Sequence, residues 1–259
     1  MKRFFTFITL ALSLMGCSKD KKDHLRVGVT NGPHAIIAEF VQKKSAEAGL
    51  NVTLIPFDDF VQPNLALEGG DLDMNIYQHE PFLKDQIQSR GFQFVSIGKA
   101  ILLPFGIYGN PSIKQLKDLK KGATVLIPSD PSNGGRALKL LEKAELLKIA
   151  PKEQPTLKDI IENPYDLKLV EVEAPLLPRL LKDDADIAVI NADWVMVAGM
   201  DPTSVLFKED TQSPYANLMV IKKGNESDPR IQKFIDLYQN EDVRAFIHKT
   251  FKGAIIPAW

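Results

Sequence analysis

Three polar segments follow predicted β-strands directly, and they hold the residues best suited to chemistry. They are Tyr77 to Phe82, Pro128 to Arg136, and Asn191. Ligands of open α/β sheets bind beyond the carboxyl ends of the strands, so we expect the three segments to face one cleft. The sequence therefore predicts a single site assembled from distant parts of the chain.

Arg136 is the most informative single residue. It follows Asn133 and two glycines at the predicted start of a helix, where the positive end of the macrodipole makes a cation mildly unfavourable. An anion held there would meet both the guanidinium fork and free backbone N–H groups. From its position alone, Arg136 could equally be a solvated arginine on the surface.

The segment around His79 allows several interpretations. His79 could act as a general base, a metal ligand or the wall of an aromatic pocket, and a lone histidine is more often a packing residue. Tyr77 and Phe82 are compatible with a ligand pocket and also with an ordinary aromatic core.

Enzyme and metal signatures are absent from the sequence. It contains no GxSxG, no GxGxxG after a strand, no P-loop and no HExxH. No histidine has a second histidine two to four positions away, and the one cysteine excludes a CxxC site. We therefore expect a binding protein rather than an enzyme, with no cofactor and no metal.

Composition narrows the class further. The 259 residues are 44% hydrophobic and 25% charged, which is typical of a soluble globular protein, and this length favours two domains. A net charge of -1, without a basic block, argues against a nucleic-acid partner.

The expected elements alternate between strand and helix, which predicts an α/β fold with largely parallel sheets. Hydrophobic periodicity and turn residues give strands at 25–29, 51–57, 72–77, 123–127, 167–172 and 186–190, and helices at 35–48, 62–68, 137–149, 176–181, 229–239 and 241–251. Residues 130–135 are expected to form a turn.

The same order of elements occurs twice, which predicts two similar lobes. Pro63, Leu65 and Asp71 recur at the same spacing as Pro178, Leu180 and Asp186. Runs at 100–108 and 215–221 are expected to cross between the lobes. We predict a first lobe of residues 25–107 plus 215–259 and a second lobe of residues 108–214.

The N-terminus has the pattern of an export signal. Two basic residues precede a twelve-residue apolar run, which is too short to cross a bilayer as a helix. Leu14 to Cys17 is similar to the lipobox of bacterial lipoproteins, which predicts a signal peptide at 1–16, lipidation at Cys17 and a tether at 17–24. A buried free cysteine is the alternative.

Five ordered motifs, with the lipobox, give the chain a family resemblance. It resembles the methionine-binding lipoproteins (MetQ/NlpA-like) of bacterial ABC importers in Val27–His34, Tyr77–Leu83, Ser132–Leu138, Glu173–Arg179 and Ser213–Leu218. The resemblance implies a two-lobed periplasmic binding protein fold of type 2, with methionine bound in the cleft between the lobes. It also implies delivery to a membrane permease driven by an ATPase.

The resemblance also implies site residues. Arg136 falls on the carboxylate-binding arginine, Asn191 and Asn217 fall on two polar asparagines, and the aromatic pocket falls on Tyr77, His79 and Phe82. The implied location is the cell envelope, lipid-anchored and facing the periplasm or the exterior. The alternatives are another small amino acid or a methionine-containing dipeptide as ligand, and a surface lipoprotein with no role in transport.

Overall fold

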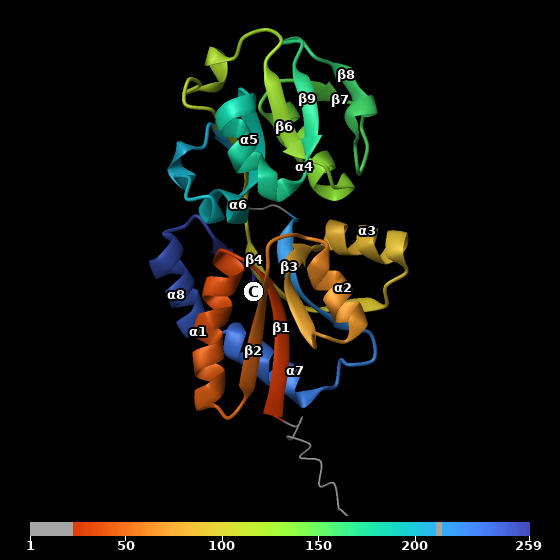
Figure 1. Ribbon diagram of the computed structural model, residues 1–259, viewed down its shortest axis with the longest axis vertical. Coiled ribbons are helices and arrows are strands. Elements are labelled where there is room, and N and C mark those ends of the chain that lie inside the picture. Colours follow the sequence, from red (N-terminus) through yellow and green to blue (C-terminus); the bar gives the residue numbers. More distant parts are fainter. Residues whose placement is uncertain (1–22, 211–213) are drawn as a thin grey trace, which may run out of the picture.

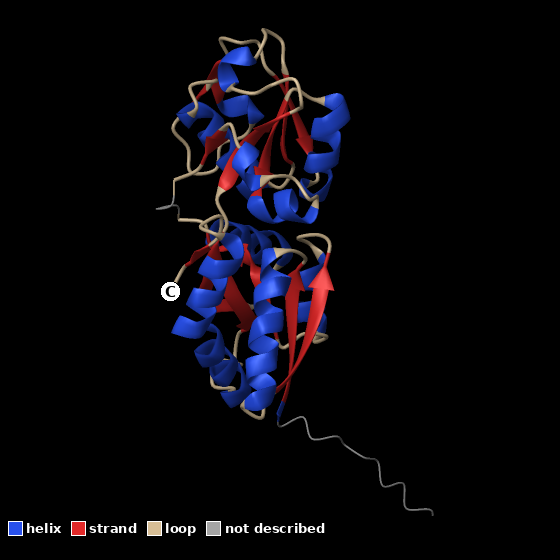
Figure 2. Ribbon diagram, turned by 90° about the vertical axis from the view of Figure 1, so that its left-hand side faces the viewer, coloured by secondary structure: helices blue, strands red, loops and turns tan. Residues whose placement is uncertain are grey.

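The computed structural model describes residues 23–210 and 214–259, which form two α/β lobes lying one above the other (Figure 1, Figure 2). The predicted signal peptide, Cys17 and nearly all of the predicted tether lie outside the described residues. Of the tether, Asp23 and His24 are described, and His24 is the first residue of strand β1.

The first lobe contains a six-stranded sheet in the order β13-β4-β12-β3-β1-β2. Strands β1, β2 and β3 are parallel, whereas β12 runs antiparallel to both of its neighbours. The strands are β1 (His24–Thr30), β2 (Asn51–Phe57), β3 (Met74–His79), β4 (Phe94–Leu102), β12 (Ala216–Lys222) and β13 (Ile256–Pro257).

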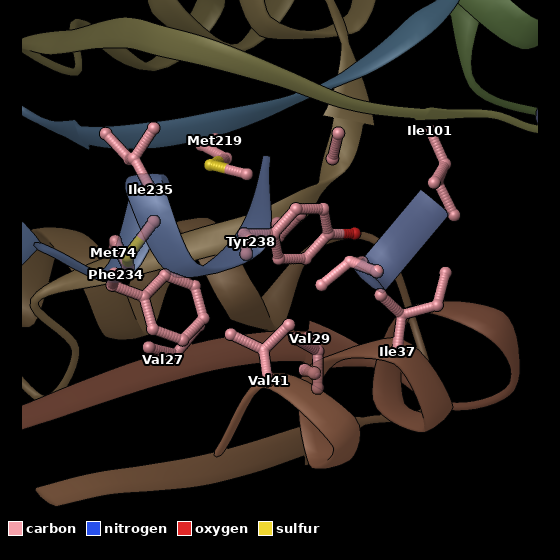
Figure 3. Packing of buried hydrophobic residues seen from close by; sticks show 14 of the residues in the cluster. Val27, Val29, Ile37, Val41, Met74, Ile101, Met219, Phe234, Ile235 and Tyr238 are labelled. Carbon is pink, nitrogen blue, oxygen red and sulfur yellow. The ribbon is translucent and has the colours of Figure 1, made fainter. Parts of the chain in front are cut away.

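Helices cover both faces of this sheet because its strands are apolar on both sides. On one face Val27 and Val29 pack against α1 (Pro33–Glu47), α7 (Pro229–Tyr238) and α8 (Glu241–Phe251), and the rings of Phe234 and Tyr238 fill the space between them (Figure 3). The other face packs against α2 (Gln62–Gly69) and α3 (Glu80–Arg90). Gly28 points to that second face, where a Cβ would lie 2.4 Å from a methyl group of Leu72.

The second lobe contains a five-stranded sheet in the order β11-β5-β10-β6-β9. Its strands are β5 (Phe105–Gly109), β6 (Thr124–Pro128), β9 (Lys168–Val172), β10 (Ile187–Asn191) and β11 (Phe207–Lys208). Its helices are α4 (Pro131–Lys143), α5 (Leu177–Asp184) and α6 (Ala192–Val197). A short ribbon of β7 (Lys148–Ile149) and β8 (Ile160–Glu162) and the 3-10 turns η2 (Leu116–Asp118), η3 (Leu157–Asp159), η4 (Ala174–Leu176) and η5 (Pro202–Ser204) complete it.

The first crossing between the lobes differs from the single strand expected at 100–108. That run forms two strands, because β4 ends at Leu102 in the first sheet and β5 begins at Phe105 in the second. Between them lies Pro104, which has no N–H to donate to a continuous ladder. Residues 105–107, which we assigned to the first lobe, therefore pair with β10 of the second.

The two lobes share one hydrogen-bond pattern at the edge where their parallel strands begin. The carboxylate of Asp73 accepts the backbone N–H of Arg26 at 2.8 Å, and the carboxylate of Asp186 accepts that of Thr124 at the same distance. Asp73, rather than the Asp71 expected from spacing, is thus the structural counterpart of Asp186.

Candidate ligand-binding site

All six side chains predicted to bind a ligand line one cavity between the lobes. Both lobes contribute to the wall of this cavity. Its lining residues are Phe60, Tyr77, Gln78, His79, Phe82, Leu103, Asn133, Arg136, Asn191, Asp193 and Asn217.

Strand ends bring the distant segments together, as the strand-end argument predicts. His79 is the last residue of β3 and Asn191 the last of β10, so both lie at carboxyl ends of parallel strands. Asn217 lies at the start of β12, which is antiparallel to β3, and it pairs there with His79. The start of an antiparallel strand therefore reaches the same edge of the sheet.

Helix α4 begins earlier than the sequence indicates. The segment 130–135, expected to form a turn, is the capped start of the helix: the carboxylate of Asp130 accepts the N–H of Asn133 at 2.9 Å, and Pro131 occupies the first position. The glycines are required by close packing, because a Cβ on Gly134 would lie 2.9 Å from the carbonyl oxygen of Pro128. Arg136 consequently stands in the second turn of α4, not the first.

Arg136 is buried, with 3% of its surface exposed, and most of its donors are already engaged. Its Nε donates to Glu209 at 3.0 Å, and its Nη2 donates both to Glu209 and to the carbonyl oxygen of Leu103. The guanidinium carbon lies 3.9 Å from the ring centroid of Phe105 and 4.2 Å from that of Tyr215. Among the described residues nothing accepts from Nη1.

His79 is neutral and joins the two lobes. Burial, with the nearby charge of Arg136, lowers the pKa of His79 to about 3. Its Nδ1 accepts the N–H of Phe82 at 3.2 Å and so caps α3, and its Nε2 lies 3.0 Å from Oδ1 of Asn133. Because Nδ1 is an acceptor, Nε2 carries the proton and donates it to Asn133 across the cavity. A side chain with both nitrogens engaged and so low a pKa is poorly suited to general-base catalysis.

The two predicted asparagines differ in how their amides are used. Asn217 donates from Nδ2 to the carbonyl oxygen of Tyr77 at 2.5 Å and to Nε2 of His34 at 2.8 Å. Its Oδ1 accepts no hydrogen bond within the described part of the chain. Asn191 makes only a long contact of 3.5 Å from Nδ2 to Asn133, and its buried Oδ1 has no partner among the described residues.

Aromatic rings form a further part of the cavity wall. The ring centroids of Tyr77 and Phe82 lie 6.0 Å apart at a steep angle, and Phe60 lies 6.0 Å from Tyr77 and 6.2 Å from Phe82. The hydroxyl of Tyr77 donates to the carbonyl oxygen of Phe60 at 2.9 Å, so the tyrosine presents its ring to the cavity. Phe60 also contacts Trp194 of the second lobe, at a centroid distance of 5.3 Å.

Five lining residues were not predicted as site residues from the sequence: Phe60, Gln78, Leu103, Asn133 and Asp193. Asn133 and Gln78 lie inside the motifs that carry the family resemblance. Asp193 had a weaker signal, an acidic residue two positions after Asn191 in an otherwise apolar run. It is 2% exposed, and burial raises its pKa to about 7.

Two features are absent from the described residues. No three histidine, cysteine, aspartate or glutamate side chains among residues 23–210 and 214–259 gather in a way that could hold a metal ion. None of the helices in these two ranges combines the length and the apolar character needed to span a membrane.

Two α/β lobes that enclose a cavity with a polar end and an aromatic wall define a two-lobed solute-binding protein. The model of the NlpA lipoprotein family matches residues 25–259, and the chain belongs to that family.

Similar proteins agree with this placement over nearly the full length. The D-methionine-binding lipoprotein MetQ of Salmonella typhi is 44% identical, over 96% of this chain and 94% of its own. The crystal structure of the methionine-binding protein MetQ has a TM-score of 0.88 at 40% identity and covers 92% of this chain and 99% of its own. A nutrient-binding protein from Burkholderia cenocepacia, solved bound to methionine, has a TM-score of 0.87 at 40% identity and covers 91% and 100%.

Proposed function

We propose that the chain is the substrate-binding lipoprotein of an ABC importer and that it captures methionine, in the L or D form. The observation that carries the proposal is one cavity lined both by aromatic rings and by polar side chains that include Arg136. This combination matches an amino acid with an apolar side chain. The names of the similar MetQ proteins support the same ligand.

The polar end holds the head group. Nη1 of Arg136 donates to the ligand carboxylate, and Asn191 and Asn217 orient the rest of the head group through their unpartnered oxygens. Glu209 fixes the guanidinium plane, so the arginine needs little further ordering when a ligand arrives.

The aromatic end holds the side chain. Thioether sulfurs make favourable contacts with aromatic rings, worth roughly 0.3–1.5 kcal/mol each. Tyr77, Phe82 and His79 supply three rings, and Phe60 adds a fourth. A methionine-containing dipeptide is the alternative ligand.

Transport needs an anchor and membrane partners. We propose that Cys17 is lipidated after removal of residues 1–16 and that the folded part faces the periplasm or the exterior. The lobes then present methionine to a permease driven by an ATPase. The chain performs no chemistry on its ligand.

Titration calorimetry tests the ligand. The protein is unfolded, dialysed and refolded to remove any retained amino acid, then titrated with L-methionine, D-methionine and a methionine-containing dipeptide. We expect a methionine form to bind more tightly than the dipeptide, and the recovered methionine to be chemically unchanged by NMR. Failure to bind any methionine form would refute the ligand assignment and leave the fold untouched.

Mass spectrometry of membrane-extracted protein tests the anchor. A lipidated Cys17 at the N-terminus of the mature chain is expected, and Cys17→Ser should remain unprocessed or be released from the membrane. An unmodified Cys17 in the membrane fraction would contradict the anchor.

A further inference from the structure

We propose that Asp193 is the counter-charge for the α-ammonium group of the ligand and that it makes the site selective for free amino acids over analogues without that group. This inference rests on the proposed function, since it concerns the same cavity. Asp193 is the only acidic residue that lines the described cavity, and it follows the end of β10 by two positions.

Asp193 is a buried carboxylate without a charged partner in the described part of the chain. It takes part in no ion pair there, because the nearby Arg136 is paired with Glu209 instead. No described side chain donates to its carboxylate, which accepts the backbone N–H of Trp194 at 3.0 Å. Burial of a carboxylate is costly unless it is paired, so a partner from outside the chain would relieve that cost.

Two amide oxygens of the cavity lining are acceptors too. Oδ1 of Asn191 is buried and unpartnered within the described residues, and the Nδ2 of Asn217 is used by His34 and Tyr77, which leaves its Oδ1. The carboxylate and the two amide oxygens receive no side-chain hydrogen bond from the described residues. An ammonium group carries three donors and a positive charge, and so it fits this set.

Arg136 and Asp193 give the cavity one cation and one anion. The free Nη1 of Arg136 suits the ligand carboxylate, whereas Asp193 repels a carboxylate and attracts an ammonium group. The pair therefore matches a zwitterion in one orientation. A structural role for Asp193 alone does not explain why a cavity-lining carboxylate has no ion-pair partner among the described residues.

The test compares two ligands and three proteins by titration calorimetry or competition. The ligands are the methionine form that binds the parent and 4-(methylthio)butanoate, which is methionine without its amino group. The proteins are the parent, Asp193→Asn and a control, Asp183→Asn, which removes an equal charge from an exposed position in the same lobe. Thermal unfolding followed by circular dichroism checks that each variant is folded.

We expect Asp193→Asn to bind methionine about 100-fold more weakly than the parent, since losing one partner of a buried charged pair has an effect of this order. Its affinity for 4-(methylthio)butanoate should be unchanged or higher, and Asp183→Asn should resemble the parent with both ligands. Equal weakening toward both ligands would indicate a structural role and overturn the inference, as would unchanged methionine binding. If the parent binds neither ligand, the proposed function fails and the inference fails with it.

Discussion

Helices α1 and α4 occupy the same place in their lobes, yet their N-termini serve different purposes. Each follows a strand of the parallel part of its sheet and begins with a proline, Pro33 in α1 and Pro131 in α4. Gly32 precedes α1 and gives no side-chain cap, whereas Asp130 caps α4. A Cβ on Gly32 would lie 3.0 Å from Val197 of the second lobe, so the N-terminus of α1 packs closely against that lobe.

The difference extends to the whole cavity. The first lobe contributes the aromatic rings, and the second contributes both charged residues of the lining, Arg136 and Asp193. A ligand that is charged at one end and apolar at the other therefore needs both lobes. A repeated fold can therefore divide recognition between its two copies: the first lobe supplies the aromatic rings and the amide of Asn217, and the second supplies the charged groups.

Removing the cation of the charged wall has the largest expected effect. Arg136→Ala should weaken methionine binding about 100-fold, because the ligand carboxylate loses its charged donor. It should also lower the free energy of unfolding by about 3–5 kcal/mol, because the largely buried Glu209 loses its charged partner and keeps only the backbone N–H of Phe105. Calorimetry and urea unfolding measure the two effects.

A double variant separates those effects. In Arg136→Met with Glu209→Met both charges are gone, so stability should recover most of its loss while binding stays weak. Parent-like binding by the folded double variant would remove Arg136 from the site.

The two lobes should also respond oppositely to acid. Burial lowers the pKa of His34 and His79 to about 3 in the folded chain. In the unfolded chain these histidines take up protons below about pH 6.5, so acid favours unfolding through them. Burial raises the pKa of Asp193 to about 7, so its carboxyl group binds a proton more tightly in the folded chain than in the unfolded chain, and acid favours folding through Asp193.

The variant Asp193→Asn loses this stabilisation by acid. Between pH 6 and 5 its free energy of unfolding should fall more steeply than that of the parent, by about 1.4 kcal/mol per pH unit.

Urea unfolding of both proteins at pH 6.0, 5.5 and 5.0 measures the two slopes. Identical slopes would show that Asp193 is ionised in the folded protein at these pH values, against the raised pKa.

Loss of the α4 cap has a smaller effect. Asp130→Ala removes the acceptor for the N–H of Asn133 and should destabilise the fold by about 1 kcal/mol, whereas Asp130→Asn, which can still cap, should cost less. Thermal unfolding compares the two variants. An alanine variant as stable as the parent would mean that α4, like α1, needs no side-chain cap.

The sequence predicted which segments meet, but not the helix caps and close packing that hold them in place. Hydrophobic periodicity located α7 and α8 to within a residue or two, because each has one apolar face. It missed α3 and placed the start of α4 too late. His79 caps α3 with an unusual acceptor, and the glycines of α4 are present for packing that only the folded chain reveals. Asp193 was missed because burial, not its type, makes it informative.

The smallest expected effect comes from the hydroxyl of Tyr77 on the aromatic wall. Tyr77→Phe deletes a hydrogen bond to the carbonyl oxygen of Phe60 and keeps the ring, so stability should fall by about 1 kcal/mol. Methionine affinity should change less than about threefold, because the hydroxyl of Tyr77 makes no hydrogen bond with the ligand in this scheme. The loss of such a bond would weaken binding about threefold or more. Tyr77→Ala removes the ring itself and should weaken binding clearly, which makes it the matched comparison. If Tyr77→Phe lost tenfold or more in calorimetry, the hydroxyl of Tyr77 would be making a polar contact with the ligand, and the assignment of Tyr77 to the aromatic part of the cavity would be wrong.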